Sequence, residues 1–163
     1  MRILAASTAL LFALVLPGLA SAASRPTVQL KLTGSVVSKS ADGKTLLTPV
    51  EKEAPKSGDT VEYAIAATNV GTAPALKLMP QGKIPAGTSY VEGSAKAQRA
   101  KVEFSLDQGK TWSASPTVTV KGPSGTPLVK KADPSLYTTI RFVTDGALAP
   151  HGTALYSYEV RVK

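Results

Sequence analysis

The sequence predicts an all-β protein, folded as an antiparallel β-sandwich of seven or eight strands. Short segments in which apolar and polar residues alternate recur along the chain, and this period of two is typical of strands with one buried face. Glycine, proline, asparagine and aspartate separate these segments at the short spacing that an antiparallel sandwich requires. No stretch after residue 22 shows the period of an amphipathic helix over three turns.

The first part of the chain predicts one strand and one hairpin. Residues 28–33 alternate Val and Leu with Gln, Lys and Thr, which predicts a strand. Asp42-Gly43 is a turn-forming pair, and it predicts a hairpin between the apolar pairs at 36–37 and 46–47. Residues 51–58 are mostly charged or polar, so we expect a solvated loop there.

The strongest strand signal covers residues 61–68, where apolar side chains occupy every second position. Asn69 and Gly71 are expected to end this strand, because both residue types tolerate the positive φ that a chain reversal needs. The Ile-Pro-Ala-Gly sequence that follows places Pro85 second and Gly87 fourth, which predicts a type I turn.

The second half of the chain predicts four more strands. They are expected over residues 102–106, 116–121, 137–143 and 153–163, with a connector of small residues at 93–100. The alternation also predicts which side chains face the core. Over 137–143 the set with Ile140 and Phe142 is placed inward and the set with Tyr137 and Thr139 outward. In the last strand the predicted inward residues are Ala154, Tyr156, Tyr158, Val160 and Val162.

The segment from Gly58 to Ser94 resembles the bacterial conserved-repeat domain of unknown function, which occurs in secreted and surface proteins. The resemblance implies an immunoglobulin-like β-sandwich. The chain departs from the family pattern at Gly82, where the family usually has Asp. The resemblance therefore implies no carboxylate that would stabilise the loop there. The matching residues are Gly58, Asp59, Val61, Tyr63, Asn69, Gly71, Ile84, Pro85, Gly87, Tyr90, Gly93 and Ser94.

Residues 1–22 have the layout of a secretory signal peptide. Arg2 precedes an apolar run, and Ala20-Ser21-Ala22 forms a small-x-small cleavage site. The alternative is an uncleaved anchor. We expect an exported protein, whether periplasmic, on the cell surface or secreted. Residues 23–163 would form a single β-sandwich domain, with an N-terminal strand and loop at 23–57 and the core resembling the conserved repeat at 58–163.

The composition argues against several kinds of site. The chain has no cysteine, which excludes a disulfide scaffold, a thiol enzyme and a Cys-ligated metal. His151 is the only histidine, and the aspartates stand beside Gly or Pro at predicted turns rather than in a calcium-binding run. We therefore expect no catalytic residue, no metal, no cofactor and no enzymatic activity.

The segment Ser105–Trp112 resembles the Asp-box hairpin of sialidase-type propellers. Asp107 is expected to accept hydrogen bonds within the turn, Gly109 to supply an unusual φ, and Trp112 to pack under the hairpin. The hypothesis of a glycan hydrolase rests on this motif alone. A propeller needs several blades, and one domain of this length does not hold them. We therefore interpret the motif as structural.

The remaining signal is the charge, with 19 basic residues, 11 acidic ones and a net charge of +8. Two groups of basic residues could contact anions: Lys96, Arg99 and Lys101, and Lys121, Lys130 and Lys131. The alternative is ordinary solubility and protection of strand edges.

The partner is unknown. The candidate partners are an envelope protein and an anionic polymer. We expect a non-catalytic module with a structural, adhesive or interaction role in the cell envelope or outside the cell. The alternative is a soluble binding protein whose basic loops hold an acidic polysaccharide, an envelope phosphate or DNA.

Overall fold

A computed structural model describes residues 24–163, and the predicted signal peptide lies outside these residues. The described residues form thirteen strands and one short 3₁₀ helix, and every strand pair is antiparallel, which confirms the predicted all-β class. Seven or eight strands were expected; the larger number includes several pairings of only two or three residues. The strands are β1 (Val28–Lys39), β2 (Thr45–Pro49), β3 (Thr60–Asn69), β4 (Ala75–Leu76), β5 (Gln81–Lys83), β6 (Thr88–Tyr90), β7 (Lys96–Ala97), β8 (Ala100–Ser105), β9 (Thr117–Lys121), β10 (Pro127–Lys131), β11 (Thr139–Thr144), β12 (Ala147–Leu148) and β13 (Thr153–Val162).

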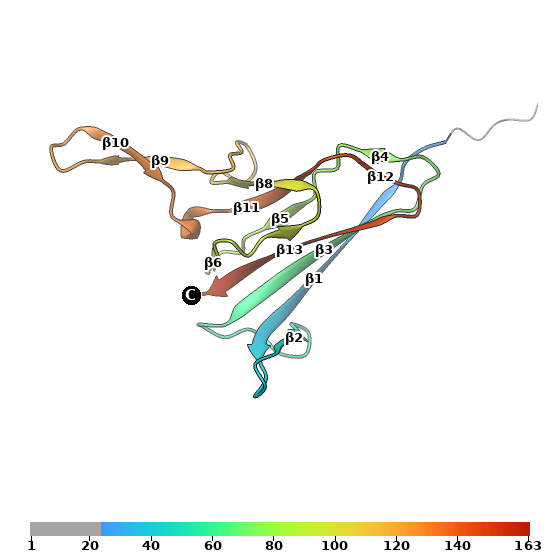
Figure 1. Cartoon of the computed structure of the whole chain (residues 1–163). Helices are drawn as coiled ribbons and strands as arrows, with labels where there is room; N and C mark the ends of the chain where they lie inside the picture. Colours follow the sequence, from blue (N-terminus) through green and yellow to red (C-terminus); the bar gives the residue numbers. More distant parts are fainter. Residues whose placement is uncertain (1–23) are drawn as a thin grey trace, which may run out of the picture.

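Two sheets form the two layers of the sandwich (Figure 1). The larger sheet has the order β2-β1-β3-β13-β6, with β7 also paired to β13, and the smaller sheet has the order β5-β11-β8. The core lies between them, where Tyr156 of β13 packs on Phe142 of β11 with ring centroids 5.1 Å apart. Tyr90 of β6 packs on Phe104 of β8 at 4.8 Å. The predicted inward residues Tyr156, Tyr158 and Val160 are buried, which confirms the orientation of the last strand.

β1 is one continuous strand of 12 residues, longer than the strand predicted at 28–33. Its first part pairs with β3, and its last part forms the predicted hairpin with β2. Leu32 lies opposite Ile65 in the ladder, yet it is 58% exposed whereas Ile65 is 3% exposed. The reason is that the smaller sheet packs against β13 and β6, so the β1 side of the larger sheet extends beyond it.

The turn after β3 forms for a different reason from the one predicted. Neither Asn69 nor Gly71 has a positive φ. Gly71 is required because the N-terminal segment crosses its backbone: a Cβ at residue 71 would lie 2.3 Å from the Arg25 carbonyl oxygen and 2.4 Å from the Thr27 nitrogen. Asn69 is fully buried, and its side chain bonds the neighbouring segments. Asn69 and Gly71 are therefore required by close packing and hydrogen bonding, and not by a positive φ.

The predicted turn at 84–87 lies one residue later. The Thr88 N–H donates to the Pro85 carbonyl at 3.1 Å, so Pro85 is the first residue of the turn and Gly87 the third. Gly87 has φ +80°, and a positive φ at the third position is the requirement of a type II turn. The type I prediction was therefore wrong.

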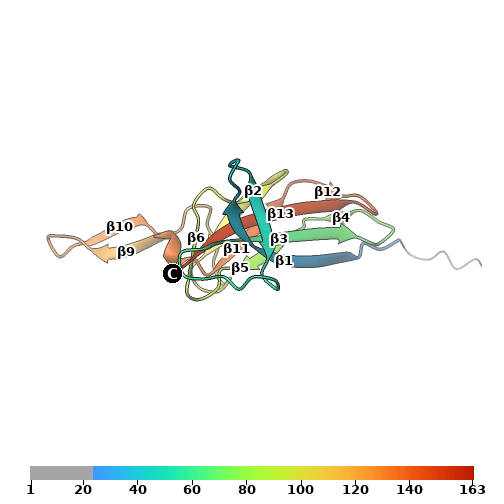
Figure 2. The same cartoon turned by 90° about the horizontal axis from the view of Figure 1, so that it is seen from below.

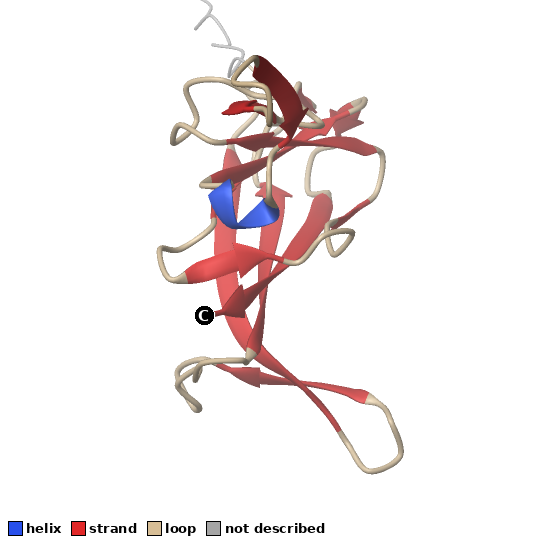
Figure 3. Cartoon of the chain, turned by 90° about the vertical axis from the view of Figure 1, so that its left-hand side faces the viewer, coloured by secondary structure: helices blue, strands red, loops and turns tan. Residues whose placement is uncertain are grey.

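Two other predicted segments also differ. The strand expected at 137–143 is β11, and it begins only at Thr139, because Pro134–Leu136 forms a 3₁₀ helix just before it (Figure 3). Ile140 and Phe142 face the core as predicted, but Tyr137 is also buried and packs on Phe104 with ring centroids 4.6 Å apart. The segment 93–100, which was expected to be a connector, contains the two-residue strand β7, and this strand pairs with β13.

β9 and β10 form a hairpin that projects from the sandwich, and we call residues 117–131 the arm (Figures 1 and 2). The two strands pair only with each other. Every residue of β10 is exposed. Across residues 24–163, no helix is long and apolar enough to span a membrane.

Candidate functional site

The six predicted basic residues do not form one patch. Lys96 lies on β7 and Arg99 follows it, and both line the same pocket, whereas Lys101 lies on β8 and does not line it. Lys121 lies on β9, and Lys130 and Lys131 lie on β10, so these three belong to the arm.

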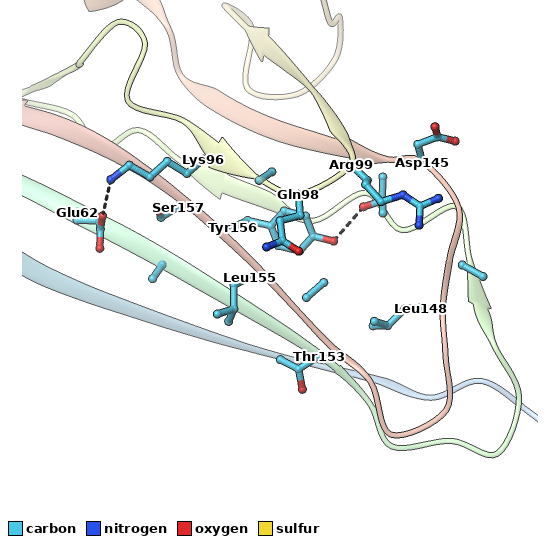
Figure 4. A pocket seen from close by; sticks show the side chains of 15 residues that line it. Glu62, Lys96, Gln98, Arg99, Asp145, Leu148, Thr153, Leu155, Tyr156 and Ser157 are labelled. Atoms are coloured by element: carbon cyan, nitrogen blue, oxygen red, sulfur yellow. Dashed lines mark hydrogen bonds and ion pairs between the residues drawn. The ribbon is translucent and has the colours of Figure 1, made fainter.

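The pocket lies at the edge of the larger sheet, where the chain leaves β7 to enter β8 (Figure 4). Its volume is about 720 Å³, which is within the range of small-ligand sites. Side chains from β3, β7 and β13 line it, together with the segment that joins β11 to β12. Its main residues are Lys96, Gln98, Arg99, Asp145, Leu148 and Leu155.

The two cations of the pocket differ in their surroundings. The Lys96 Nζ lies 3.9 Å from the Glu62 carboxylate, so its charge is partly compensated. For Arg99, no ion pair is found within residues 24–163. The backbone of Arg99 has φ +53°, and its carbonyl accepts the N–H of Asp145 at 2.7 Å. Its guanidinium lies 3.1 Å from the position of a Cβ on Gly146, whose φ of +92° favours glycine at this position.

The floor of the pocket is apolar. Ala64 and Leu155 belong to the outer face of the larger sheet, and Ala97 and Leu148 complete the floor. Leu155 is 68% exposed in a strand whose inward side chains are buried. The sequence patterns did not indicate this pocket, although a leucine at an outward position of the last strand was a detectable signal.

The arm carries both charge and exposed apolar surface. Leu128 is 51% exposed and Val129 is 64% exposed. Lys131 forms an ion pair with Glu92 of the sandwich, and this carboxylate raises the pKa of Lys131. Within the described residues, Lys121 and Lys130 form no ion pair.

The hairpin at Ser105–Trp112 is held by its own polar groups. One oxygen of Asp107 accepts the N–H of Thr111 at 2.8 Å, and the other accepts the Thr111 hydroxyl at 2.7 Å. Ser105 Oγ donates to Asp107 and accepts the N–H of Gly109, which has φ +92°. The hydrogen bonds from Thr111 lower the pKa of Asp107 to about 2. Both carboxylate oxygens of Asp107 therefore accept hydrogen bonds from within the turn.

Trp112 is half-buried, and the Arg141 side chain covers one face of its ring. Its indole N–H donates to the Gly109 carbonyl at 3.0 Å, and the Arg141 guanidinium lies 4.5 Å from the ring centroid. Arg141 in turn pairs with Glu103 at 2.6 Å. The stacked guanidinium occupies the face on which a sugar ring would otherwise pack.

Metal-binding residues do not gather in the described part of the chain: residues 24–163 hold no group of three or more His, Cys, Asp or Glu side chains that could bind an ion. His151 is exposed in the turn before β13, with φ +60°, and its backbone N–H donates to the Asn69 carbonyl. His151 is therefore a turn residue in the structure.

No family model, no curated protein and no solved structure matches the chain. The resemblance to the conserved-repeat domain therefore stays a prediction.

Proposed function

We propose that the protein is an exported, non-catalytic β-sandwich module that acts by contact with other molecules in the cell envelope or outside the cell. The arm is the contact element in this proposal. The support for export is the signal-peptide layout of residues 1–22, and the resemblance to domains of secreted and surface proteins agrees with it.

The observation that carries the proposal is the arm. An isolated two-stranded hairpin is only marginally stable in water, and the arm pairs with no strand of the sandwich. It nevertheless exposes Leu128 and Val129, which lie on β10 of the projecting arm (Figure 1). Apolar side chains on a projecting element contribute to stability only when a partner removes them from water. Exposed apolar surfaces therefore commonly mark interaction sites.

The charge of the arm supports a second candidate, binding of an anionic polymer. Residues 117–131 contain three lysines and no acidic residue. Lys121 and Lys130 lack an ion-pair partner in the described part of the chain. Such a site would bind acidic polysaccharide, envelope phosphate or DNA mainly through its charge, and the affinity would fall as salt rises.

The test is retention of the purified protein on isolated envelopes from its own source, measured across a salt series. The contact proposal predicts that Leu128→Ser with Val129→Ser lowers retention at all salt concentrations. Leu46→Ser with Leu47→Ser is the matched control, because these β2 leucines are similarly exposed but lie outside the arm.

The second candidate predicts a different pattern. Lys121→Gln with Lys130→Gln would then remove most retention, and retention of the unmodified protein would decay steeply with salt. If neither pair of substitutions changes retention, the arm is not the contact element. If the unmodified protein is not retained, both envelope-binding candidates are wrong.

A further inference from the structure

We propose that the pocket beside β7 binds an extended peptide segment that carries a carboxylate, with the segment aligned along the free edge of β13 and its carboxylate held by Arg99. The pocket is built from elements outside the arm, so this binding is independent of the contact proposed above.

The strand edge is the first observation. On the side away from β3, β13 pairs with β7 only at Tyr156 and Ser157, and with β6 only from Val160 onward. The edge from Thr153 to Leu155 therefore has no strand beside it, and these residues line the pocket. An unpaired edge offers backbone donors and acceptors to an added strand, which is a common way to bind extended peptides.

The charge is the second observation. Arg99 is the uncompensated cation of the pocket, since Lys96 is engaged with Glu62. A guanidinium binds a carboxylate through two parallel hydrogen bonds, which makes it the preferred partner for this group. The backbone of Arg99 is tied to Asp145 through its carbonyl, in a conformation that non-glycine residues rarely adopt.

The carboxylate of Asp145 does not fill the site. Figure 4 shows it directed away from the floor that Leu148 and Leu155 form. It is not within ion-pair distance of Arg99. The guanidinium therefore remains available to a ligand.

The floor is the third observation, and it selects among ligand classes. Ala64, Ala97, Leu148 and Leu155 provide an apolar surface next to Arg99, which suits small aliphatic side chains beside the carboxylate. Sugar sites usually offer an exposed aromatic face, but the aromatic residue here, Tyr156, is only 2% exposed. An acidic peptide fits this surface better than a saccharide.

The experiment starts from a displayed library of random eight-residue peptides, selected on the purified protein. The expected result is enrichment of sequences with one Asp or Glu two residues away from Val, Ile or Leu, because alternate side chains of an extended segment share a face. Affinity of an enriched peptide is then measured by fluorescence anisotropy. Arg99→Gln should weaken binding by about tenfold or more, because a charge-assisted pair is lost. Leu155→Ser should also weaken it, because the apolar contact that the floor provides is lost.

Matched controls make the result specific. Lys101→Gln removes a nearby basic residue that does not line the pocket, and it should leave the affinity unchanged. Replacing the acidic residue of the peptide by its amide should weaken binding to the unmodified protein but not to Arg99→Gln. The proposal is overturned if the library gives no enrichment, or if enriched peptides bind Arg99→Gln and Leu155→Ser as tightly as the unmodified protein. Thermal unfolding of each variant confirms that it is folded.

Discussion

The phenol ring of Tyr158 lies directly over the backbone of Gly82, so that a Cβ at residue 82 would be 2.4 Å from the ring carbon Cε1. The Tyr158 hydroxyl donates to the Lys83 carbonyl at 2.6 Å. This contact joins β13 of the larger sheet to β5 of the smaller one. It also explains why residue 82 is a glycine, because a side chain would not fit beneath the ring.

The first prediction concerns Gly82→Ala. The added methyl group would overlap the Tyr158 ring, so the two sheets must separate locally or the ring must move. We expect a loss of about 1–3 kcal/mol in the free energy of unfolding, which is typical of overpacking in a core. Urea unfolding followed by tryptophan fluorescence measures it.

Two controls test the cause of this loss. Gly34→Ala should be milder, because the nearest atom to its Cβ would be a side-chain atom of Tyr63 at 3.3 Å, near ordinary contact distance. In the Tyr158→Leu background the effect of Gly82→Ala should shrink, since the ring is gone. A full-sized effect in that background would contradict the proposed overlap.

The second prediction concerns Asn69, which ties three segments together at one end of the sandwich. Its Oδ1 accepts the N–H groups of Gly71 and Thr27, at 3.1 and 3.3 Å. Its Nδ2 donates to the carbonyls of Ala73 and Leu148, at 2.8 and 3.1 Å. Because Asn69 is fully buried, a substitution leaves these four backbone groups without another hydrogen-bond partner inside the protein.

Asn69→Ala should therefore lower the free energy of unfolding by about 3 kcal/mol. Asn69→Asp should be no better tolerated, because two carbonyl oxygens would then face a carboxylate. The neighbouring Thr68→Ala removes only an exposed hydroxyl pair with Thr153, so a change within about 0.5 kcal/mol is expected. A stable Asn69→Asp protein would contradict the role given to Nδ2. Chemical denaturation of the three variants provides the comparison.

The core of the fold was predictable from the sequence because its strands are half-buried. In β13 the inward residues Tyr156, Tyr158 and Val160 alternate with polar or exposed ones, and a period of two records that arrangement directly. The exposure of Leu32 was not predictable, since its pattern matches that of a buried strand. Its exposure depends on how far the smaller sheet extends, which is a property of the packed layers.

The candidate pocket was only partly predictable for a related reason. Lys96 and Arg99 were noted because basic residues cluster in the sequence there. Asp145 and Leu155 reach the same pocket from distant parts of the chain. Local sequence patterns carry no information about which edges meet when the chain passes from one sheet to the other. The reason that residue 71 must be glycine was unpredictable in the same way, because it depends on the N-terminal segment that crosses this residue.

The third prediction is that acid weakens the Ser105–Trp112 hairpin through Asp107. Its pKa in the folded protein is about 2, lowered from 3.8 by the hydrogen bonds from Thr111. Because the folded-state pKa is the lower one, its stabilisation is present above pH 3.8 and is lost as the pH falls through about 2. Asp107→Asn should lower the melting temperature at pH 7 but flatten its decline between these pH values. Thermal unfolding across this window measures both effects, and equal declines in the two proteins would exclude Asp107 as the titrating group.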